Sequence, residues 1–79
     1  MPQTTRILGM QVRELRLKAG LSQKELAQQA RVSREWLGSF ENGKPTVEIG
    51  MVLDVIGVLG YTIEIQKDRE YILPRRTVS

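Results

Sequence analysis

Three polar side chains near the middle of the chain have the chemistry of groups that read nucleic-acid bases. They are Arg34, Glu35 and Ser39, and Gly38 between them leaves room for a close approach. An arginine can bond O6 and N7 of a guanine together, for roughly 1–3 kcal/mol of discrimination, and a carboxylate accepts from a cytosine amine. Glu35 repels a phosphate backbone unless it meets such an amine or orients Arg34. The three side chains therefore predict a surface that contacts base edges.

Two short helices must position these side chains. The first, over 22–30, begins at Ser22, whose hydroxyl caps the free amides of the first turn, and Glu25 completes a capping box. The second begins at Ser33, another good N-cap, and runs to about Phe40. Two helices this short and this close together must cross steeply.

The crossing leaves the second helix with a face that it cannot bury. Only a small side chain fits at the crossing, and Ala27 lies there. The base-reading candidates project outward from the second helix. A short helix with a polar, protruding face suits the major groove of DNA. The pattern therefore predicts a helix-turn-helix whose second helix enters that groove.

The segment from Leu21 to Lys44 resembles the phage-repressor family, also called the XRE or Cro/C1 family. It opens with Leu-Ser-Gln-Lys-Glu-Leu-Ala and closes with Phe-Glu-Asn-Gly-Lys. The resemblance covers roughly residues 6–60. Its parts stand at fixed offsets, namely Gln23, Ala27, Leu37 and Glu41-Asn42-Gly43. The resemblance implies a DNA-binding domain of four to five helices.

The resemblance also implies roles for individual residues. Arg16 pairs with Glu41 and so braces the first helix of the domain against the end of the recognition helix. The Asn42 amide and the backbone beside it grip a phosphate, while Lys44 adds positive charge. One departure is Arg31, where the family usually has a glycine in a left-handed turn. A non-glycine residue in that conformation costs about 1 kcal/mol.

A second set of residues is predicted to hold the DNA backbone through polar groups and helix N-termini. Two interpretations of Trp36 stay open: it packs on sugar, phosphate or a thymine methyl, or it covers the edge of the core. Asn42 has a helix C-cap as a compatible second role. The backbone candidates are Gln23, Ser33, Trp36, Asn42 and Lys44.

Two further helices complete the predicted domain. One runs from Arg6 to about Ala19 with a single apolar stripe and ends at Gly20. The other is capped by Thr46 and runs to about Leu59. This last helix carries two apolar stripes. They consist of Ile49, Val52, Leu53, Ile56 and Leu59, and of Val47, Met51, Val55 and Val58.

One stripe of this helix can close the core, so we expect the other to face a second copy of the chain. The alternative is a wholly buried helix, which would need four surrounding helices where three are predicted. Residues 61–66 then alternate and predict a β-strand. A lone strand needs a partner. We expect the same strand of a second chain, with a hairpin to residues 71–73 as the alternative. The predicted dimerisation residues are Met51, Val55, Val58, Tyr61, Ile63 and Ile65.

A helix-turn-helix domain over 1–60 followed by a dimerising strand and short tail over 61–79 is similar in layout to the antitoxins of HipA-type kinase toxin–antitoxin pairs. In those proteins the strand joins two protomers, and the dimer represses its own operon and holds the toxin. The resemblance implies a HipA-like kinase toxin as a partner. We expect the tail over 74–79 to be mobile, and to contact a toxin, to be the point where proteases begin, or to have no role.

Composition sets the outer limits. The 79 residues make one domain with a thin core, and the formal charge of +3 favours a polyanionic partner such as double-stranded DNA. The chain has no cysteine and no histidine, so we expect no disulfide, metal or cofactor. It shows no signal core and no apolar run long enough to span a bilayer, which favours a cytoplasmic protein that does not meet a membrane.

These observations predict a mainly α fold: a phage-repressor-like domain followed by one short strand that pairs across a dimer. The predicted function is a repressor that binds a palindromic operator and acts as an antitoxin. One alternative is a stand-alone regulator of a phage or metabolic operon. Another is a protein-interaction module that does not bind DNA. An enzyme is not expected, because there is no glycine-rich phosphate loop and no convergent carboxylate pair.

Overall fold

The computed structural model describes residues 3–65 and 70–74, with side chains over 5–63. Its elements are α1 (Gln3–Lys18), α2 (Gln23–Ala30), α3 (Arg34–Glu41), α4 (Ile49–Val58), β1 (Tyr61–Ile65) and β2 (Glu70–Pro74). The mainly helical class is confirmed, with four helices in the described part of the chain. Within residues 3–65, no helix combines the length and the apolar character needed to span a bilayer.

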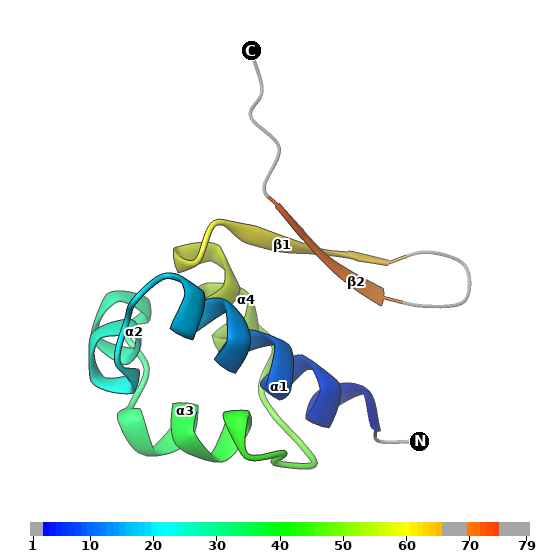
Figure 1. Ribbon diagram of the computed structural model, residues 1–79. Coiled ribbons are helices and arrows are strands. Elements are labelled where there is room, and N and C mark those ends of the chain that lie inside the picture. Colours follow the sequence, from blue (N-terminus) through cyan, green and yellow to red (C-terminus); the bar gives the residue numbers. More distant parts are fainter. Residues whose placement is uncertain (1–2, 66–69, 75–79) are drawn as a thin grey trace.

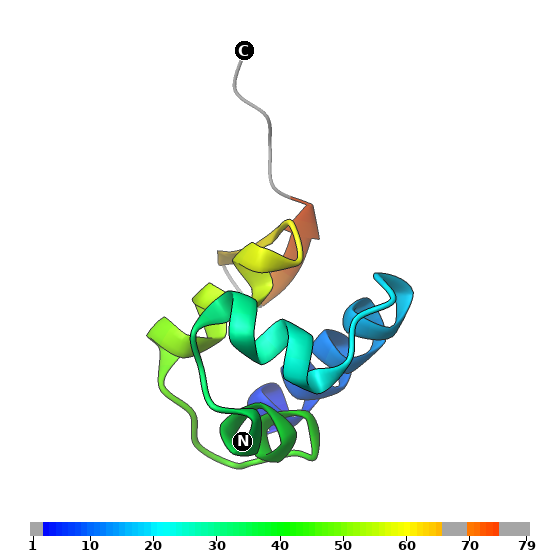
Figure 2. The same ribbon diagram turned by 90° about the vertical axis from the view of Figure 1, so that its left-hand side faces the viewer.

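The helices form one body with α3 at one end and the β-hairpin at the other. In Figure 1 the hairpin lies above α1 and α4, whereas α3 runs along the bottom. The view turned by 90° keeps the two at opposite ends (Figure 2). The outer face of α3 is therefore remote from the hairpin.

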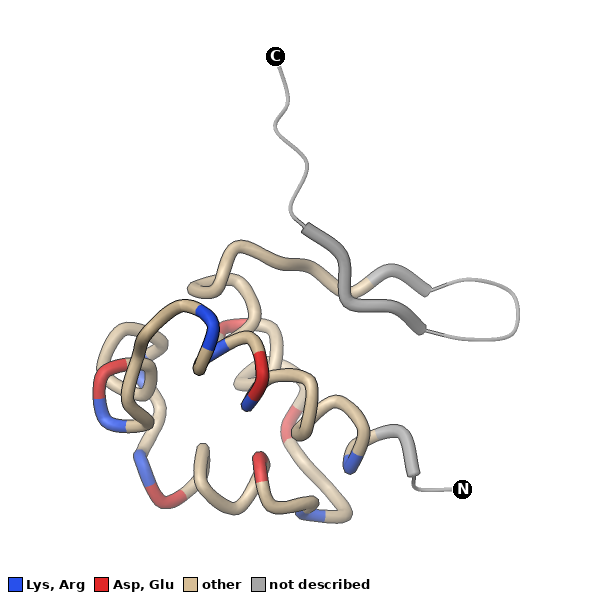
Figure 3. Tube along the Cα trace, in the orientation of Figure 1, with Lys and Arg blue, Asp and Glu red and all other residues tan. Residues whose placement is uncertain are grey.

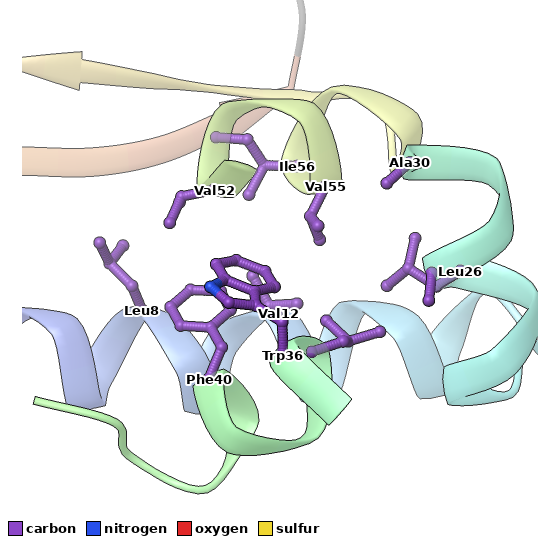
Figure 4. Close-up of a cluster of buried hydrophobic side chains, with 11 residues drawn as sticks. Leu8, Val12, Leu26, Ala30, Trp36, Phe40, Val52, Val55 and Ile56 are labelled. Atoms are coloured by element: carbon purple, nitrogen blue, oxygen red, sulfur yellow. The ribbon is translucent and has the colours of Figure 1, made fainter. Parts of the chain in front are cut away.

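All four helices contribute side chains to one buried cluster, much of which is shown in Figure 4. Trp36 and Phe40 stack at its centre, with ring centroids 5.2 Å apart. Ala27 is 2% exposed, in agreement with the small side chain expected inside the helix pair. The cluster consists of Leu8, Val12, Leu26, Ala27, Ala30, Trp36, Leu37, Phe40, Val52, Val55 and Ile56.

The predicted N-caps of α2 and α3 are confirmed. The Ser22 hydroxyl accepts from the Glu25 amide at 3.0 Å, and the Glu25 carboxylate accepts from the Ser22 amide at 2.8 Å. The Ser33 hydroxyl accepts from the Trp36 amide at 3.0 Å. Each cap satisfies amides that have no partner within the helix, and so fixes where the helix begins.

Left-handed residues end the first three helices. Gly20 follows α1 with φ 74° and Gly43 follows α3 with φ 96°. At both ends the next amide reaches back to the carbonyl five residues earlier, in the pattern that satisfies the last carbonyls of a helix. Arg31 ends α2 with φ 61°, the only positive φ of a non-glycine residue in the described part of the chain. Arg31 therefore adopts the left-handed conformation in which the resembled family usually has a glycine.

Gly9 lets the backbones of α1 and α3 touch. A Cβ atom on Gly9 would lie 2.0 Å from the Phe40 carbonyl oxygen and 3.0 Å from its carbon. Real Cβ atoms essentially never come within 3.0 Å of another heavy atom. Only glycine fits at this crossing, and the contact fixes the last turn of α3 against α1. No role for Gly9 was predicted from the sequence.

The start of α4 differs from the prediction. The helix begins at Ile49, and the residue before it, Glu48, makes no side-chain capping bond. Thr46 was predicted as the cap, and that was wrong. The extended residues before α4 bring Val47 against the core, where it is partly buried. Burying that valine favours an extended segment over an earlier helix start.

The buried face of α4 combines residues from both predicted stripes. Val52, Val55 and Ile56 are at most 1% exposed, whereas Ile49 is 61% and Leu53 is 46% exposed. The prediction that Val55 contacts a second chain was therefore wrong. Because the apolar surface of this helix is wide, the face that packs against the core lies between the two stripes and takes residues from both. The spare apolar flank of α4 instead contains Ile49 and Leu53.

The strand predicted over 61–66 is present as β1, but its partner lies in the same chain. β1 pairs antiparallel with β2 in a two-stranded sheet, with Ile63 opposite Ile72. The hairpin alternative is confirmed, and pairing of the strand with a second chain stays a prediction. A short connection closes the pair at a smaller entropic cost than the capture of a second molecule.

Candidate nucleic-acid interface

The three base-reading candidates lie together on the outer face of α3. Arg34, Glu35 and Ser39 are all exposed, and half-buried Gly38 lies among them. The opposite face of α3 carries Trp36, Leu37 and Phe40 into the core. The helix thus presents a guanidinium, a carboxylate and a hydroxyl to solvent from one rigid element. Their spacing on two helical turns matches what a major groove can admit.

A buried ion pair holds the far end of α3. Arg16 Nε donates to Glu41 Oε2 at 2.8 Å, and a second guanidinium nitrogen donates to Oε1 at 2.9 Å. The remaining guanidinium nitrogen donates to the Leu21 carbonyl at 2.9 Å. The side chains are 9% and 1% exposed. The predicted brace between α1 and the recognition helix is present, in the bidentate geometry that arginine favours.

Hydrogen bonding by Glu41 raises the pKa of Arg16, against the opposing effect of burial. The guanidinium therefore stays charged under all ordinary conditions. Loss of one partner would leave an uncompensated buried charge, which typically costs 3–5 kcal/mol. The pair accordingly fixes the direction in which α3 points.

Gln23 joins this network from the first turn of α2. Its amide nitrogen donates to Glu41 Oε1 at 3.1 Å, and the side chain is half-buried. A Cβ atom on Gly38 would stand 3.6 Å from Gln23 Oε1, an ordinary contact distance. The first residue of α2 is thus hydrogen-bonded to the end of α3 and lies beside its middle. Its contact to phosphate stays a prediction.

The other backbone candidates bracket α3. Ser33 is exposed at its start, Asn42 is exposed at its end, and half-exposed Lys44 lies in the following loop. Asn42 has φ −90°, so the left-handed conformation of this turn falls on Gly43. Polar groups at both ends of a groove-sized helix suit phosphates on the two sides of a groove.

Trp36 does not belong to the exposed surface. It is 8% exposed and stacks on Phe40 (Figure 4). The prediction that it contacts the DNA backbone was wrong, and the alternative that it packs with the core is confirmed. Its indole N–H is buried without a hydrogen-bond partner among the described residues. Trp36 is next to the inward-facing Leu37, and its large indole ring packs into the core on the same side of α3. Burial of so large an apolar ring stabilises the fold by more than one unpaired N–H destabilises it.

Figure 3 shows basic positions at the start of α3, in the loop after it and at the start of α1, all along the lower side of the molecule. The side chains involved include Arg34, Lys44 and Arg6. Glu35 is the acidic exception on the exposed face of α3. Positive charge at the ends of the polar face favours a polyanion whose backbone flanks the groove. Arg6 was absent from the predicted site.

The remaining dimerisation candidates are only partly available to a partner. Met51, Tyr61 and Ile63 are half-buried against the core, and Val58 is 36% exposed. Ile65 lies in β1, with its side chain outside the described residues. Larger apolar exposure is found elsewhere. Within residues 5–63, the most exposed large apolar side chains are Ile7, Met10, Leu17, Ile49 and Leu53.

Comparison with known proteins agrees with this geometry. A family model described as a helix-turn-helix domain matches residues 7–64. An uncharacterized HTH-type transcriptional regulator, y4mF, from Sinorhizobium fredii is 43% identical over 58 residues, which are 73% of this chain and 76% of that protein.

A solved structure shares the fold. The crystal structure of the clp gene regulator ClgR from Corynebacterium glutamicum matches with a TM-score of 0.66 and 32% identity, over 71% of this chain. The match spans 60% of the ClgR chain. Since the helix-turn-helix model covers most of the present sequence, the chain belongs to the helix-turn-helix domain family.

Proposed function

We propose that this protein is a sequence-specific DNA-binding transcriptional repressor. The observation that carries the proposal is the exposed polar face of α3, fixed in direction by the buried Arg16–Glu41 pair. The family match and the names of two relatives as gene regulators support it. A rigid helix loses little backbone entropy on binding, which suits direct readout of bases.

In the proposed complex α3 enters the major groove. Arg34 bonds a guanine edge, Ser39 bonds a neighbouring base, and Glu35 accepts from a cytosine amine or orients Arg34. Gly38 allows the helix axis to approach the bases. The backbone contacts come from Gln23, Ser33, Asn42 and Lys44.

We propose further that the protein acts as a homodimer on a palindromic operator. Two copies would place their α3 helices about one DNA turn, ~34 Å, apart. The exposed flank with Ile49 and Leu53, together with Val58 and the hairpin, supplies apolar surface for such an interface. The hairpin lies at the end of the molecule opposite α3, so contacts made there leave the polar face free (Figure 1).

The finer proposal is an antitoxin that represses its own operon and binds a HipA-like kinase toxin, as a cytoplasmic protein without catalysis, metal or cofactor. It is supported by the layout of four helices followed directly by the hairpin of β1 and β2. A stand-alone regulator is the competing function. Co-purification of the chain with a kinase encoded beside it distinguishes the two.

The test of DNA binding is a gel shift on the DNA upstream of the gene, over a series of salt concentrations. Arg34→Ala and Ser39→Ala should reduce the preference for this DNA over a random duplex. Gln11→Ala, an exposed polar change on α1, serves as the control and should bind as the wild type does. A wild type that shows no preference for its own upstream DNA would overturn the proposal.

A further inference from the structure

The first turn of α1 is fastened to the loop that follows α3. The Thr5 hydroxyl donates to the Pro45 carbonyl at 3.0 Å, across forty residues of sequence. One residue later, the side chain of Arg6 lies over Gly43. A Cβ atom on Gly43 would stand 3.4 Å from Arg6 Cγ and 4.0 Å from its Nε. The beginning of the domain and the end of the recognition helix therefore form one local surface.

The aliphatic stem of Arg6 lies beside Gly43, and its guanidinium makes no ion pair within residues 5–63. Arg6 is exposed, and the single ion pair found over residues 5–63 joins Arg16 and Glu41 instead. Gly43, with φ 96°, has no side chain to displace the stem. An exposed arginine without a carboxylate partner keeps its charge and its planar fork of donors for an anion.

The residues around Arg6 indicate which anion its guanidinium would bind. The residues on either side of Gly43 are Asn42 and Lys44, which the proposed function places on DNA phosphates. Figure 3 shows the basic positions of the α1 start and of this loop on the side of the molecule that α3 occupies. No base edge is required for a guanidinium to bind a phosphate, because its planar fork matches two phosphate oxygens.

We propose that Arg6 is a DNA-backbone contact, and that it completes a phosphate clamp formed by residue 6 and residues 42–44. The clamp joins two segments that are remote in sequence and holds a phosphate adjoining those bound by Asn42 and Lys44. It rests on the proposed DNA-binding function. It adds affinity without sequence preference, since it reads charge and not bases.

The test compares Arg6→Gln with Lys18→Gln on the upstream DNA. Both remove one exposed positive charge from α1, and Lys18 lies about 18 Å further along the helix. Loss of one phosphate contact should flatten the plot of log affinity against log salt by about 0.9 per protomer. Between 50 and 200 mM salt, the wild type should then lose about 3.5-fold more affinity per protomer than Arg6→Gln does. Lys18→Gln should keep the wild-type slope.

Ethylation interference locates the contact. Arg6→Gln should lose interference at a phosphate next to those lost by Lys44→Gln, with the preference among base sequences unchanged. Arg6→Lys keeps the charge and the stem, so it should keep the salt slope and guards against a folding defect in the glutamine variant. If the wild type binds specifically and Arg6→Gln behaves as Lys18→Gln, the clamp is refuted while the repressor function stands. If the wild type itself fails to bind, both are refuted.

Discussion

Replacement of Gly9 by alanine has two opposite effects on the free energy of unfolding, each of known size. Alanine is a better helix former than glycine by about 0.8–1.0 kcal/mol, so propensity alone predicts a more stable protein. The contact with α3 predicts the reverse. The new Cβ would stand 2.0 Å from the Phe40 carbonyl oxygen, where 3.0 Å is the closest approach normally seen. Both partners are helix backbone, so α1 and α3 must separate by about 1 Å.

A separation of about 1 Å affects more than one contact. Dispersion contacts along the crossing lose a quarter to a half of their strength when a gap of this size opens. The Arg16–Glu41 bonds, now 2.8 and 2.9 Å long, would stretch beyond good geometry. Overpacking typically costs 1–3 kcal/mol, and damage to the ion pair adds to it. With about 2 kcal/mol for partial damage to the ion pair, and less the gain of about 1 kcal/mol in helix propensity, Gly9→Ala should lower the free energy of unfolding by about 2–4 kcal/mol.

Urea denaturation followed by circular dichroism measures this change. Gly50→Ala is the matched control, because a Cβ atom there would have nothing within 4 Å in the described structure. That variant should be as stable as the wild type or more stable by up to about 1 kcal/mol. If Gly9→Ala were as stable as Gly50→Ala, the close approach of α1 to α3 would be refuted.

Three further predictions concern the ion pair, the turn and a cap. Arg16→Met should cost about 3–5 kcal/mol in urea denaturation, and the double variant with Glu41→Leu should recover most of that loss; equal instability of both would contradict the account. Arg31→Gly should gain about 1 kcal/mol and raise Tm by roughly 4–8 °C, and a loss of stability would show that the left-handed arginine is not strained. Bonds from Ser22 lower the pKa of Glu25 in the folded protein, so the carboxylate stabilises the fold above its unfolded pKa and loses that effect as pH falls through the lower folded value. Wild-type stability should accordingly fall more steeply than that of Glu25→Gln below about pH 4.5, and parallel pH profiles would count against the capping box.

Local chemistry made much of the helix-turn-helix predictable. Ser22 and Ser33 act on amides three residues away, and Gly20 ends α1 through its own backbone freedom, so each signal lies within a short stretch of sequence. The pairing of Arg16 with Glu41 is a long-range contact. It was predictable only because the resemblance to phage repressors implies it.

Contacts between elements were harder to predict. Gly9 reads as an ordinary helix-weakening glycine until α3 is placed against it, and the role inferred for Arg6 needs the fold of the loop at Gly43. The two stripes of α4 were equally apolar, and only packing decided that Val55 is buried while Leu53 is exposed.

The position of α3 on the DNA is tested most directly by a titration of isotope-labelled protein with a duplex from the upstream region, followed by backbone amide chemical shifts. If α3 binds the major groove, the largest changes should fall within residues 33–44, on both sides of the polar face, and at Arg6. Changes confined to the exposed apolar residues of α4 and to the hairpin, with α3 unaffected, would contradict it. Such changes would indicate that the molecule binds another protein through this surface and does not bind DNA through α3.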